Sequence, residues 1–476
     1  MASRVLGLGF WKEVTYGVIP DLSAGTGAIQ LLRLVSDDLN TTLQREESNE
    51  IRADAQSSGS IITNASVGGS VQLQWSMKTY DDFIPGLLYS TSDAGTGRDN
   101  GWLAGGYVLP TALMATPQSV TFVFATNKFT FSPVLGRAPV AGEKILIRGF
   151  GNRNLDTVWE VSATTPGTAE FTPVNDTGAA TVAAYAGVTA DVTVTTGFAA
   201  QVVGYARNGT LERSFGLLKT FTDISAAGPA GTTPVLTAGH DWAAFRGMIA
   251  QSLQISASPG QAGWTGSLTF LGKDEIILGP NVTVANQGFA VDNWDCFTVP
   301  TTVPLVNTLQ NVILVRVRES DSTLSGSPPG YGGAASPLCR RHDPLSANIN
   351  VSNNGTGVGA LRNLGNILVQ QGTFTASVTL SVIYDGPSYH TGMLVDKAYE
   401  LEIGLMDASF NAQLWRFPRC RLLSERPNPG KNQVVQTTLT FSAEAGGDGM
   451  TGTAQLTLET ANTGKMIEVL RFYALP

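Results

Sequence analysis

A repeated hairpin constrains the fold of this chain more than any other feature. Residues 245–270, FRGMIAQSLQISASPGQAGWTGSLTF, align with residues 415–441, WRFPRCRLLSERPNPGKNQVVQTTLTF. In both segments an alternating run reaches a Pro-Gly pair, Pro259-Gly260 in the first and Pro429-Gly430 in the second, and a second run ends in Leu-Thr-Phe. Pro-Gly between two alternating runs is typical of a turn between strands. The chain therefore uses one strand–turn–strand unit twice.

A second pair of segments lies upstream of the two hairpins in the same order. Residues 68–88, GGSVQLQWSMKTYDDFIPGLL, resemble residues 375–394, TASVTLSVIYDGPSYHTGML, with Val71 matching Val378. Each begins as a strand with apolar and polar residues in alternation and passes through a Tyr-Asp turn into a short apolar helix. Two matched segments in the same order indicate a duplicated unit.

The distribution of patterns predicts an all-β chain with a few short helices, arranged as two tandem β-sandwich or β-barrel domains and a small inserted β domain. Gly and Pro, 53 and 23 residues, separate many short alternating runs. The clearest strands are residues 119–125, 144–148, 192–196, 251–256, 266–271, 373–383 and 433–442. The expected helices are residues 79–88, 241–246 and 388–394. Thr79 is expected to cap the first of these, with Asp81 and Asp82 in its first turn.

The two copies differ in length, which predicts where the inserted domain lies. Val71 stands 175 positions before Arg246. Val378 stands only 38 positions before Arg416, so the first copy carries an insertion of 137 residues. We expect a first domain in two parts, residues 1–110 and 199–299, an inserted β module at 111–198, a linker or extended arm at 300–344, and a second domain at 345–476.

Composition excludes several classes of protein. The formal net charge is -8, and binding to nucleic acid through its phosphates requires basic clusters instead. Only 14% of the residues are charged, which suits a surface covered in an assembly. Three cysteines without metal-ligand spacing favour a reducing compartment over a disulfide framework or a zinc site. The sequence contains no apolar run long enough to predict a membrane span. Lys12 interrupts the N-terminal apolar run too early for a signal peptide.

The search for reactive clusters predicts no catalytic, cofactor or metal site. The histidines His240, His342 and His390 occur outside any metal-binding pattern. Charged residues are instead expected at contacts between subunits. The residues in question are Arg45, Glu46, Glu47, Glu50 and Arg52, together with Arg416, Arg419 and Arg421.

Several segments resemble the major tail tube proteins of long-tailed, siphovirus-type bacteriophages. The opening KEVTYGVIPDLSAGTGAIQLLRLVSDDL, residues 12–39, is similar to the family's N-terminus. Residues 48–88, 213–224 and 252–274 resemble its later strands. The segment AGEKILIRGFGNRNLDTVWEVSA, residues 141–163, is similar to a β module inserted in some members.

This resemblance implies a structural virion protein that is not an enzyme. Such proteins form stacked rings that enclose a hollow tube, the conduit for genome ejection. With two tube domains per chain, three subunits would close a ring of pseudo-sixfold symmetry. The implied partners are further copies of the chain, the tape-measure protein, the tail terminator and distal tail or baseplate proteins. Genomic double-stranded DNA would pass through the lumen without specific binding, and assembly would take place in the host bacterial cytoplasm, with no membrane involved.

The polar sides of the two matched strands are the candidate lumen or ring-packing surface. They comprise Ser70, Gln72, Gln74 and Ser76, and Thr375, Ser377, Thr379 and Ser381. Two other functions remain open. An adhesin or capsid-decorating protein would use the inserted module for binding, and would form trimers that do not polymerise. A carbohydrate-active enzyme would need a pair of carboxylates facing a cleft.

Overall fold

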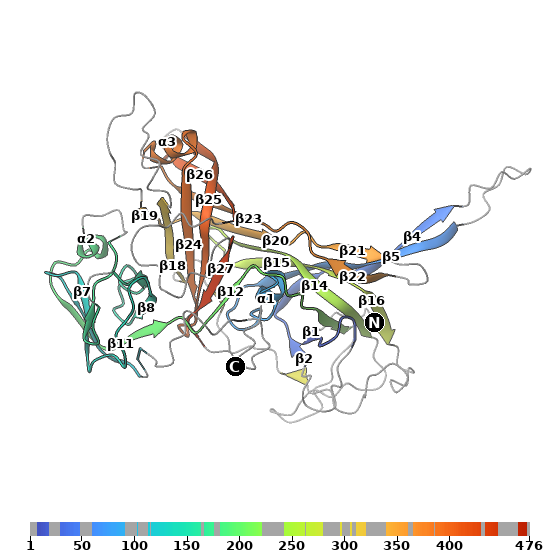
Figure 1. Cartoon of the computed structure of the whole chain (residues 1–476), viewed down its shortest axis with the longest axis horizontal. Helices are drawn as coiled ribbons and strands as arrows, with labels where there is room; N and C mark the ends of the chain where they lie inside the picture. Colours follow the sequence, from blue (N-terminus) through green and yellow to red (C-terminus); the bar gives the residue numbers. More distant parts are fainter. Residues whose placement is uncertain are drawn as a thin grey trace, which may run out of the picture.

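The fold is seen in a computed structural model of the chain. It describes residues 7–18, 29–47, 60–90, 102, 113–114, 116–162, 166–175, 181–220, 242–261, 263–278, 296–297, 305–306, 311–319, 339–359, 365–384, 386–429, 434–445 and 465–473. The described part of the chain is dominated by antiparallel strands (Figure 1). The prediction of an all-β fold with a few short helices is confirmed.

Most strands belong to one large sheet system. The N-terminal half contributes β1 (Gly7–Lys12), β2 (Ile29–Leu31), β3 (Leu34–Asp37), β4 (Asn40–Glu47), β5 (Ser60–Gln74), β12 (Gly204–Arg207), β13 (Phe215–Thr220), β14 (Trp242–Ala257), β15 (Thr265–Gly272) and β16 (Asp274–Leu278). The C-terminal half contributes β17 (Cys296–Phe297), β18 (Val312–Glu319), β19 (Cys339–Arg341), β20 (Ser346–Ser352), β23 (Thr375–Ile383), β24 (Ala398–Met406), β25 (Ala412–Asn428), β26 (Gln436–Ala443) and β27 (Glu468–Arg471). A separate hairpin consists of β21 (Thr356–Gly359) and β22 (Asn366–Gln370).

The same order of antiparallel pairings occurs in the two halves. In the first, β1 pairs with β13, β13 with β14, β14 with β15 and β16, and β15 with β5. In the second, β18 pairs with β24, β24 with β25, β25 with β26 and β27, and β26 with β23. The halves meet where β14 pairs with β20, which itself pairs with β23. One continuous sheet therefore runs from β5 to β25.

A single hydrophobic core cluster extends through both halves. Trp75, at the end of β5, packs edge-on against Trp415 of β25 with ring centroids 6.3 Å apart. Both indoles are 1% exposed or less. Burying a large apolar side chain contributes roughly 1.5–3 kcal/mol, so this contact gives the two halves a shared part of their stability.

The C-terminal strand joins the halves a second time. β27 pairs with β12 on one side and with β25 on the other. Residues 312–319, inside the predicted linker at 300–344, form β18 and pair with β24. The remaining boundaries of the predicted domains stay predictions.

The inserted segment has its own sheet and its own core. Its strands are β6 (Gln118–Val123), β7 (Lys128–Ser132), β8 (Lys144–Arg148), β9 (Val158–Glu160), β10 (Glu170–Phe171) and β11 (Val192–Gln201). They pair in the order β10-β7-β6-β11-β8-β9, and a bridge between Val161 and Pro173 connects the two outer strands. Phe122, Phe129 and Trp159 are fully buried within it. We call residues 116–201 the inserted module; it lies at one end of the molecule in Figure 1.

The three described helices are short: α1 (Phe83–Leu87), α2 (Val182–Ala186) and α3 (Ser388–Leu394). The helix predicted at 388–394 is confirmed. The helix predicted at 79–88 is confirmed only as α1, and the capping role of Thr79 is wrong because the helix begins four residues later. The Thr79 hydroxyl instead accepts a hydrogen bond from Ser76 Oγ at 2.9 Å.

The helix predicted at 241–246 is wrong. Its described part, from residue 242, begins β14 and lies between β13 and β16. Ala243, Ala244 and Phe245 are each 1% exposed or less. A strand buried on both faces reads as a continuous apolar run, which sequence periodicity does not separate from a buried helix. In the described part of the chain, no helix is long and apolar enough to cross a membrane.

Candidate functional site

The polar sides of β5 and β23 belong to one face of the continuous sheet. Cross-strand pairing links Gln72 to Ser267, Ser267 to Gln254, Gln254 to Asn350, Asn350 to Ser377, and Ser377 to Ser442. The next row comprises Gln74, Thr265, Ser256, Asn348, Thr379 and Thr440. Two further rows comprise Ser70, Thr269, Ser252, Ser352 and Thr375, and Ser346, Ser381 and Thr438. None of these residues is charged. We call these four rows the uncharged face.

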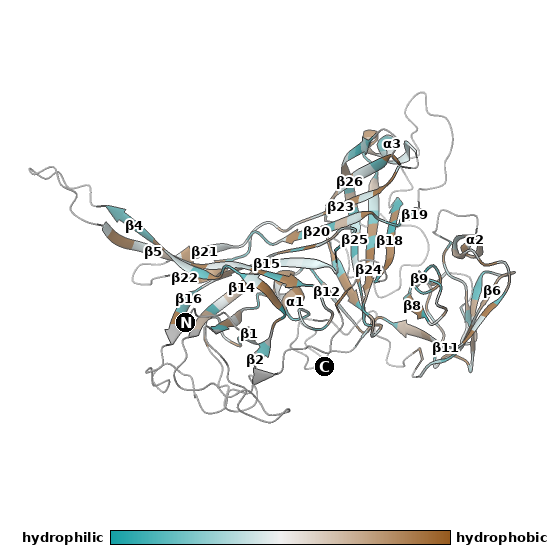
Figure 2. Ribbon diagram, turned by 180° about the vertical axis from the view of Figure 1, so that it is seen from behind, coloured by the Kyte–Doolittle hydropathy of each residue, from teal (hydrophilic) through white to brown (hydrophobic). Residues whose placement is uncertain are grey.

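The alternation along each strand separates this face from the core. Gln72 and Gln74 are exposed, while Val71 and Leu73 between and beside them are 1% and 2% exposed. Successive side chains of a strand point to opposite faces, so each polar row lies over an apolar one. Figure 2 shows hydrophilic and hydrophobic residues alternating along strands of this sheet.

Side chains on the uncharged face hydrogen-bond one another across the strands. Gln72 Nε2 donates to Ser267 Oγ at 2.8 Å, and Gln254 Nε2 donates to Asn348 Oδ1 at 3.3 Å. The hydroxyls of Ser256 and Thr265 lie 3.1 Å apart. These neutral groups are well hydrated and offer no net charge to an anion.

Ser76 is the exception among the eight predicted surface residues. β5 ends at Gln74, and the Ser76 side chain turns inward, where the residue is 1% exposed. Its assignment to the exposed polar side is therefore wrong. The other seven lie on the uncharged face. Their proposed role toward a lumen stays a prediction.

Sequence reasoning missed the contributions of β14, β15, β20 and β26 to this face. These strands show the same alternation of small polar and apolar residues, so the signal was present in each strand. What the sequence alone does not give is the pairing of β14 with β20, which brings the two halves into one sheet.

The predicted inter-subunit residues of the N-terminal half lie on an extended arm. Arg45, Glu46 and Glu47 are exposed on β4, which pairs with the first part of β5. These two strands leave the body as a two-stranded ribbon (Figure 1). Glu50 and Arg52 lie outside the described residues. A two-stranded ribbon in water has little stability of its own, so this arm is suited to packing on another surface.

The predicted inter-subunit arginines of β25 have partners within the chain. Arg419 and Arg421 lie 3.4 and 3.2 Å from Glu444, and Arg421 also lies 3.4 Å from Asp396. Arg416 is buried, with its Nε 2.7 Å from Glu400 and its Nη1 3.0 Å from Glu468. Their contact with another subunit stays a prediction.

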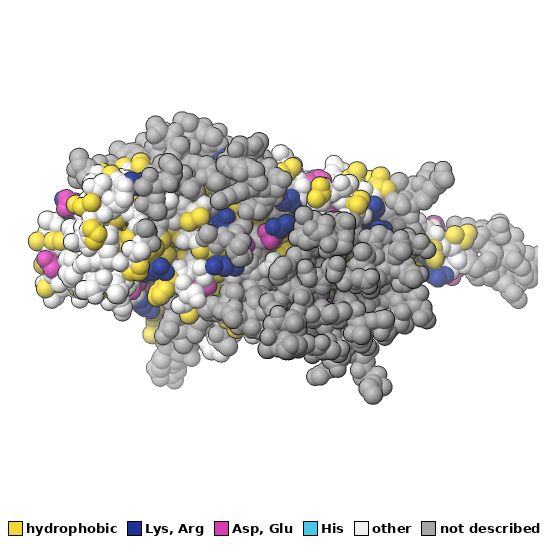
Figure 3. Space-filling view, turned by 90° about the horizontal axis from the view of Figure 1, so that it is seen from below, with side chains coloured by type: hydrophobic (Ala, Val, Ile, Leu, Met, Phe, Trp, Pro, Cys, Tyr) yellow, Lys and Arg dark blue, Asp and Glu magenta, His cyan; other side chains and the backbone are white. Residues whose placement is uncertain are grey.

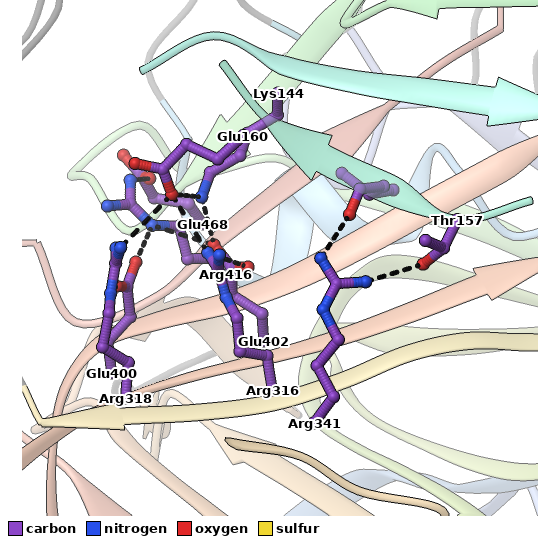
Figure 4. Close-up of polar contacts among 11 residues, drawn as sticks. Lys144, Thr157, Glu160, Arg316, Arg318, Arg341, Glu400, Glu402, Arg416 and Glu468 are labelled. Carbon is purple, nitrogen blue, oxygen red and sulfur yellow. Dashed lines mark hydrogen bonds and ion pairs between the residues drawn. The ribbon is translucent and has the colours of Figure 1, made fainter. Parts of the chain in front are cut away.

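Arg416 is part of a buried ion network that joins the inserted module to the C-terminal half (Figure 4). Lys144 of the module lies 2.7 Å from Glu160 and 2.9 Å from Glu402 of β24. Arg316 of β18 lies 2.5 Å from Glu402 and 3.3 Å from Glu160. The network consists of four cations, Lys144, Arg316, Arg318 and Arg416, and four anions, Glu160, Glu400, Glu402 and Glu468. The charges balance, which offsets the cost of burying them.

The cations of the network lower the pKa of Glu160, Glu400 and Glu402. Burial acts to raise the pKa of Glu160, but the charges of Lys144, Arg318 and Arg316 outweigh it and hold the pKa far below its ordinary value. The same competition, mainly with Arg318 and Arg416, lowers the pKa of Glu400. Sequence reasoning missed this network because its members come from six strands, β8, β9, β18, β24, β25 and β27, which only the fold brings together.

Asp81 forms a second buried polar site. Its carboxylate accepts hydrogen bonds from Tyr473 Oη at 2.8 Å and from Gln413 Nε2 at 2.8 Å. Asp81 therefore connects the segment before α1 to the C-terminal half. Burial raises the pKa of Asp81 to about 6, against the lowering effect of the Tyr473 hydrogen bond and of Arg471. Asp82 is partly buried, with its carboxylate 2.7 Å from Lys12 Nζ.

The described residues contain no group of three or more His, Cys, Asp or Glu side chains that could hold a metal ion. On the face in Figure 3, lysine and arginine side chains of the described residues are scattered instead of forming one large basic patch.

Comparisons with known proteins give one clear result. A family model described as "Phage tail tube protein" matches residues 2–443. A search of curated proteins returned no match. Among solved structures, a chain of the anti-feeding prophage baseplate, seen by cryo-electron microscopy with 6-fold symmetrisation, is 12% identical. That match covers 27% of this chain and 86% of the other at a TM-score of 0.19, a level that carries no argument.

Proposed function

The chain belongs to the phage tail tube protein family, a structural component of the virion tail, and we propose that it polymerises into stacked rings that form the hollow tail tube. The tube is the conduit for genome ejection in a siphovirus-type tail. The observation that carries this proposal is the uncharged face, which six consecutive strands from both halves of the chain form together.

The chemistry of this face suits the wall of a channel for DNA. Double-stranded DNA carries closely spaced phosphates, and each lysine or arginine that meets them releases counterions and strengthens binding. A wall of Ser, Thr, Asn and Gln offers neither this attraction nor a carboxylate repulsion that would resist entry. DNA can then slide along hydrated, neutral side chains. We therefore assign the uncharged face to the lumen.

The recurring strand order supports a duplicated tube domain. Both β14 and β25 carry a register shift at the same place, between Ala250 and Ser252 and between Leu422 and Ser424. In each case the residue before the shift pairs with the Phe of the Leu-Thr-Phe motif, Phe270 or Phe441. We propose that the two halves are equivalent tube domains and that three chains form a ring of pseudo-sixfold symmetry.

The remaining elements have roles in this arrangement. The arm of β4 and β5, with Arg45, Glu46 and Glu47, would contact a neighbouring ring. The inserted module would lie on the outside of the tube, because the uncharged face contains none of its strands. Further partners would be the tape-measure protein during assembly and the tail terminator and distal tail or baseplate proteins at the two ends, with assembly in the host cytoplasm.

The lumen assignment is tested by placing positive charge on the uncharged face. Gln72→Lys with Thr379→Lys adds one lysine to each half. Virions with this double variant should assemble, and DNA release, followed by a fluorescent DNA dye, should be slower and should recover in high salt. The matched control, Thr168→Lys with Thr195→Lys, adds the same charge to exposed positions of the inserted module.

Normal release from assembled Gln72→Lys, Thr379→Lys virions would overturn the lumen assignment. Equal slowing in the control would assign the effect to net charge alone. The alternative function, an adhesin or capsid-decorating protein, draws on the separate core of the inserted module. It predicts that the purified protein forms isolated trimers without stacking.

A further inference from the structure

The pairing of β14 with β20 is a seam between two equivalent halves. It is antiparallel and runs from Ser252 opposite Ser352 to Ala257 opposite Ala347. Across it, Gln254 Nε2 donates to Asn348 Oδ1 at 3.3 Å. This diagonal contact joins two neutral amides, and both side chains lie on the uncharged face.

β25 presents the counterpart of the β14 side of this seam. Aligning the two register shifts places Ser424 at the position of Ser252, and two residues later Arg426 at the position of Gln254. On its outer side, residues 422–428 of β25 pair with no strand among the described residues. Pro427 lies within this stretch, and proline in a strand is confined to edges.

The counterpart of the β20 side lies at the other end of the sheet. In the second half, Val378 of β23 pairs with Phe441, and the next residue, Thr379, pairs with Asn348 of β20. In the first half, Gly69 of β5 pairs with Phe270, so the next residue, Ser70, corresponds to Thr379. The residue beside Ser70 is Asp38, whose backbone N–H donates to the Ser70 carbonyl at 3.0 Å. Asp38 therefore takes the place of Asn348.

We propose that Arg426 of one chain forms an ion pair with Asp38 of the next chain, at the seam between subunits of the ring. This inference rests on the proposed function and adds the residues that join one copy to the next. The two positions correspond to Gln254 and Asn348, whose contact the structure shows. The partner is a second copy of this chain.

The state of both side chains fits this assignment. Arg426 is exposed, and no carboxylate in the described part of the chain forms an ion pair with it. The Asp38 side chain is exposed, and among the described residues it accepts hydrogen bonds from Ser70 alone, through the backbone N–H and through Oγ at 3.1 Å. Two opposite charges at opposite ends of one sheet thus have no ion-pair partner among the residues that the structure describes.

The replacement of an amide pair by a charge pair gives the ring a direction. Joining two β25 edges would place Arg426 near Arg426, and joining two β3–β4 edges would place Asp38 near Asp38. Like charges at an interface disfavour such contacts. Only the head-to-tail contact pairs opposite charges, and a head-to-tail contact is the one that closes a ring. The β14–β20 seam needs no such selection, because its two strands belong to the same polypeptide.

A charge exchange tests the pair. Arg426→Asp and Asp38→Arg should each raise the protein concentration needed for tube assembly, measured by light scattering, by about tenfold or more at low salt. The double variant should assemble within about threefold of the wild-type protein. Arg153→Asp, the same charge change on the inserted module, should assemble normally.

Failure of the double variant to recover, or normal assembly of both single variants, would overturn the proposed pair. A second measurement covers variants that fail to fold. Asn428 takes the position of Ser256, directly opposite Asn348, so Asn428→Cys in one protein should form a disulfide with Asp38→Cys in another.

Mixed oxidation of the two cysteine variants should give linked heterodimers on a non-reducing gel. If the wild-type protein forms tubes but the two cysteine variants form no crosslink, the proposed seam is refuted and the proposed function stands. Absence of wild-type rings and tubes by electron microscopy would refute the proposed function itself.

Discussion

Replacing Asp81 by Asn should change how the stability of the protein depends on pH. The Asp81 carboxylate is 1% exposed, and its hydrogen-bond donors, Tyr473 and Gln413, are neutral. The other charges that act on it are Arg471, which lowers its pKa, and Asp82, which raises it. Lys78 contributes a backbone hydrogen bond. Burial dominates, so the folded chain binds a proton at Asp81 more tightly than the unfolded chain does.

The size of the effect follows from the pKa. A rise from 3.8 to about 6 on folding corresponds to about 3 kcal/mol between the fully ionised and fully protonated limits. Since the folded pKa is the higher one, protonation stabilises the fold as the pH falls below about 6, and this gain is complete below the unfolded value. Between pH 7 and pH 5 the gain amounts to about 1 kcal/mol. Asn cannot titrate, so Asp81→Asn loses this term.

The assay is urea unfolding followed by tryptophan fluorescence, with both proteins measured at several pH values between 5 and 7. Other carboxylates act equally on the two proteins and cancel in the difference between their free energies of unfolding. This difference should shift by about 1 kcal/mol in favour of the wild type as the pH falls from 7 to 5. Asp343→Asn, at the exposed ion pair with Arg153, is the control. A pH-independent difference for Asp81→Asn would refute the reasoning.

Two further predictions concern stability. Lys144→Met removes one of the cations that contact Glu160 and Glu402 and leaves the buried network with one more anion than cations, so it should lower the free energy of unfolding by about 3–5 kcal/mol. Lys128→Met, at a partly exposed pair, should cost at most about 1 kcal/mol. Equal losses in urea unfolding would contradict the structural role of the network. Gly216→Ala places a Cβ 1.9 Å from the buried Trp11 ring and should cost at least about 1–3 kcal/mol. Gly167→Ala meets nothing closer than 3.9 Å and should be nearly neutral, so a comparable loss in melting temperature for both would show that the Trp11 contact is not the cause.

Much of the fold follows from local patterns. Alternation of polar and apolar residues predicts the strands at 144–148 and 266–271, because each of these strands has paired neighbours and a buried side. The same rule fails at residues 243–245, where β14 is buried on both faces. The pattern predicts the short helix after β5 but not the residue at which it begins, because Asp81 accepts a hydrogen bond from the distant Tyr473 and does not lie in the helix.

The site is less accessible from sequence than the strands. The polar sides of β5 and β23 could be identified because each strand alternates strictly. Their union into one face depends on β14 pairing with β20, and no local pattern specifies which strand edges meet. The ion network is a stronger case, because Lys144, Arg316 and Glu402 become neighbours only through the packing of the inserted module on β18 and β24.

The central claim is that the uncharged face lines the lumen of a tube built from this chain. Cryo-electron microscopy of tubes assembled from the purified protein tests it most directly. The account predicts hollow tubes of stacked rings, three chains to a ring, with Gln72, Gln254 and Thr379 facing the channel. Tubes in which these side chains are buried between rings or point outward, or a protein that stays as separate particles under all conditions, would contradict it.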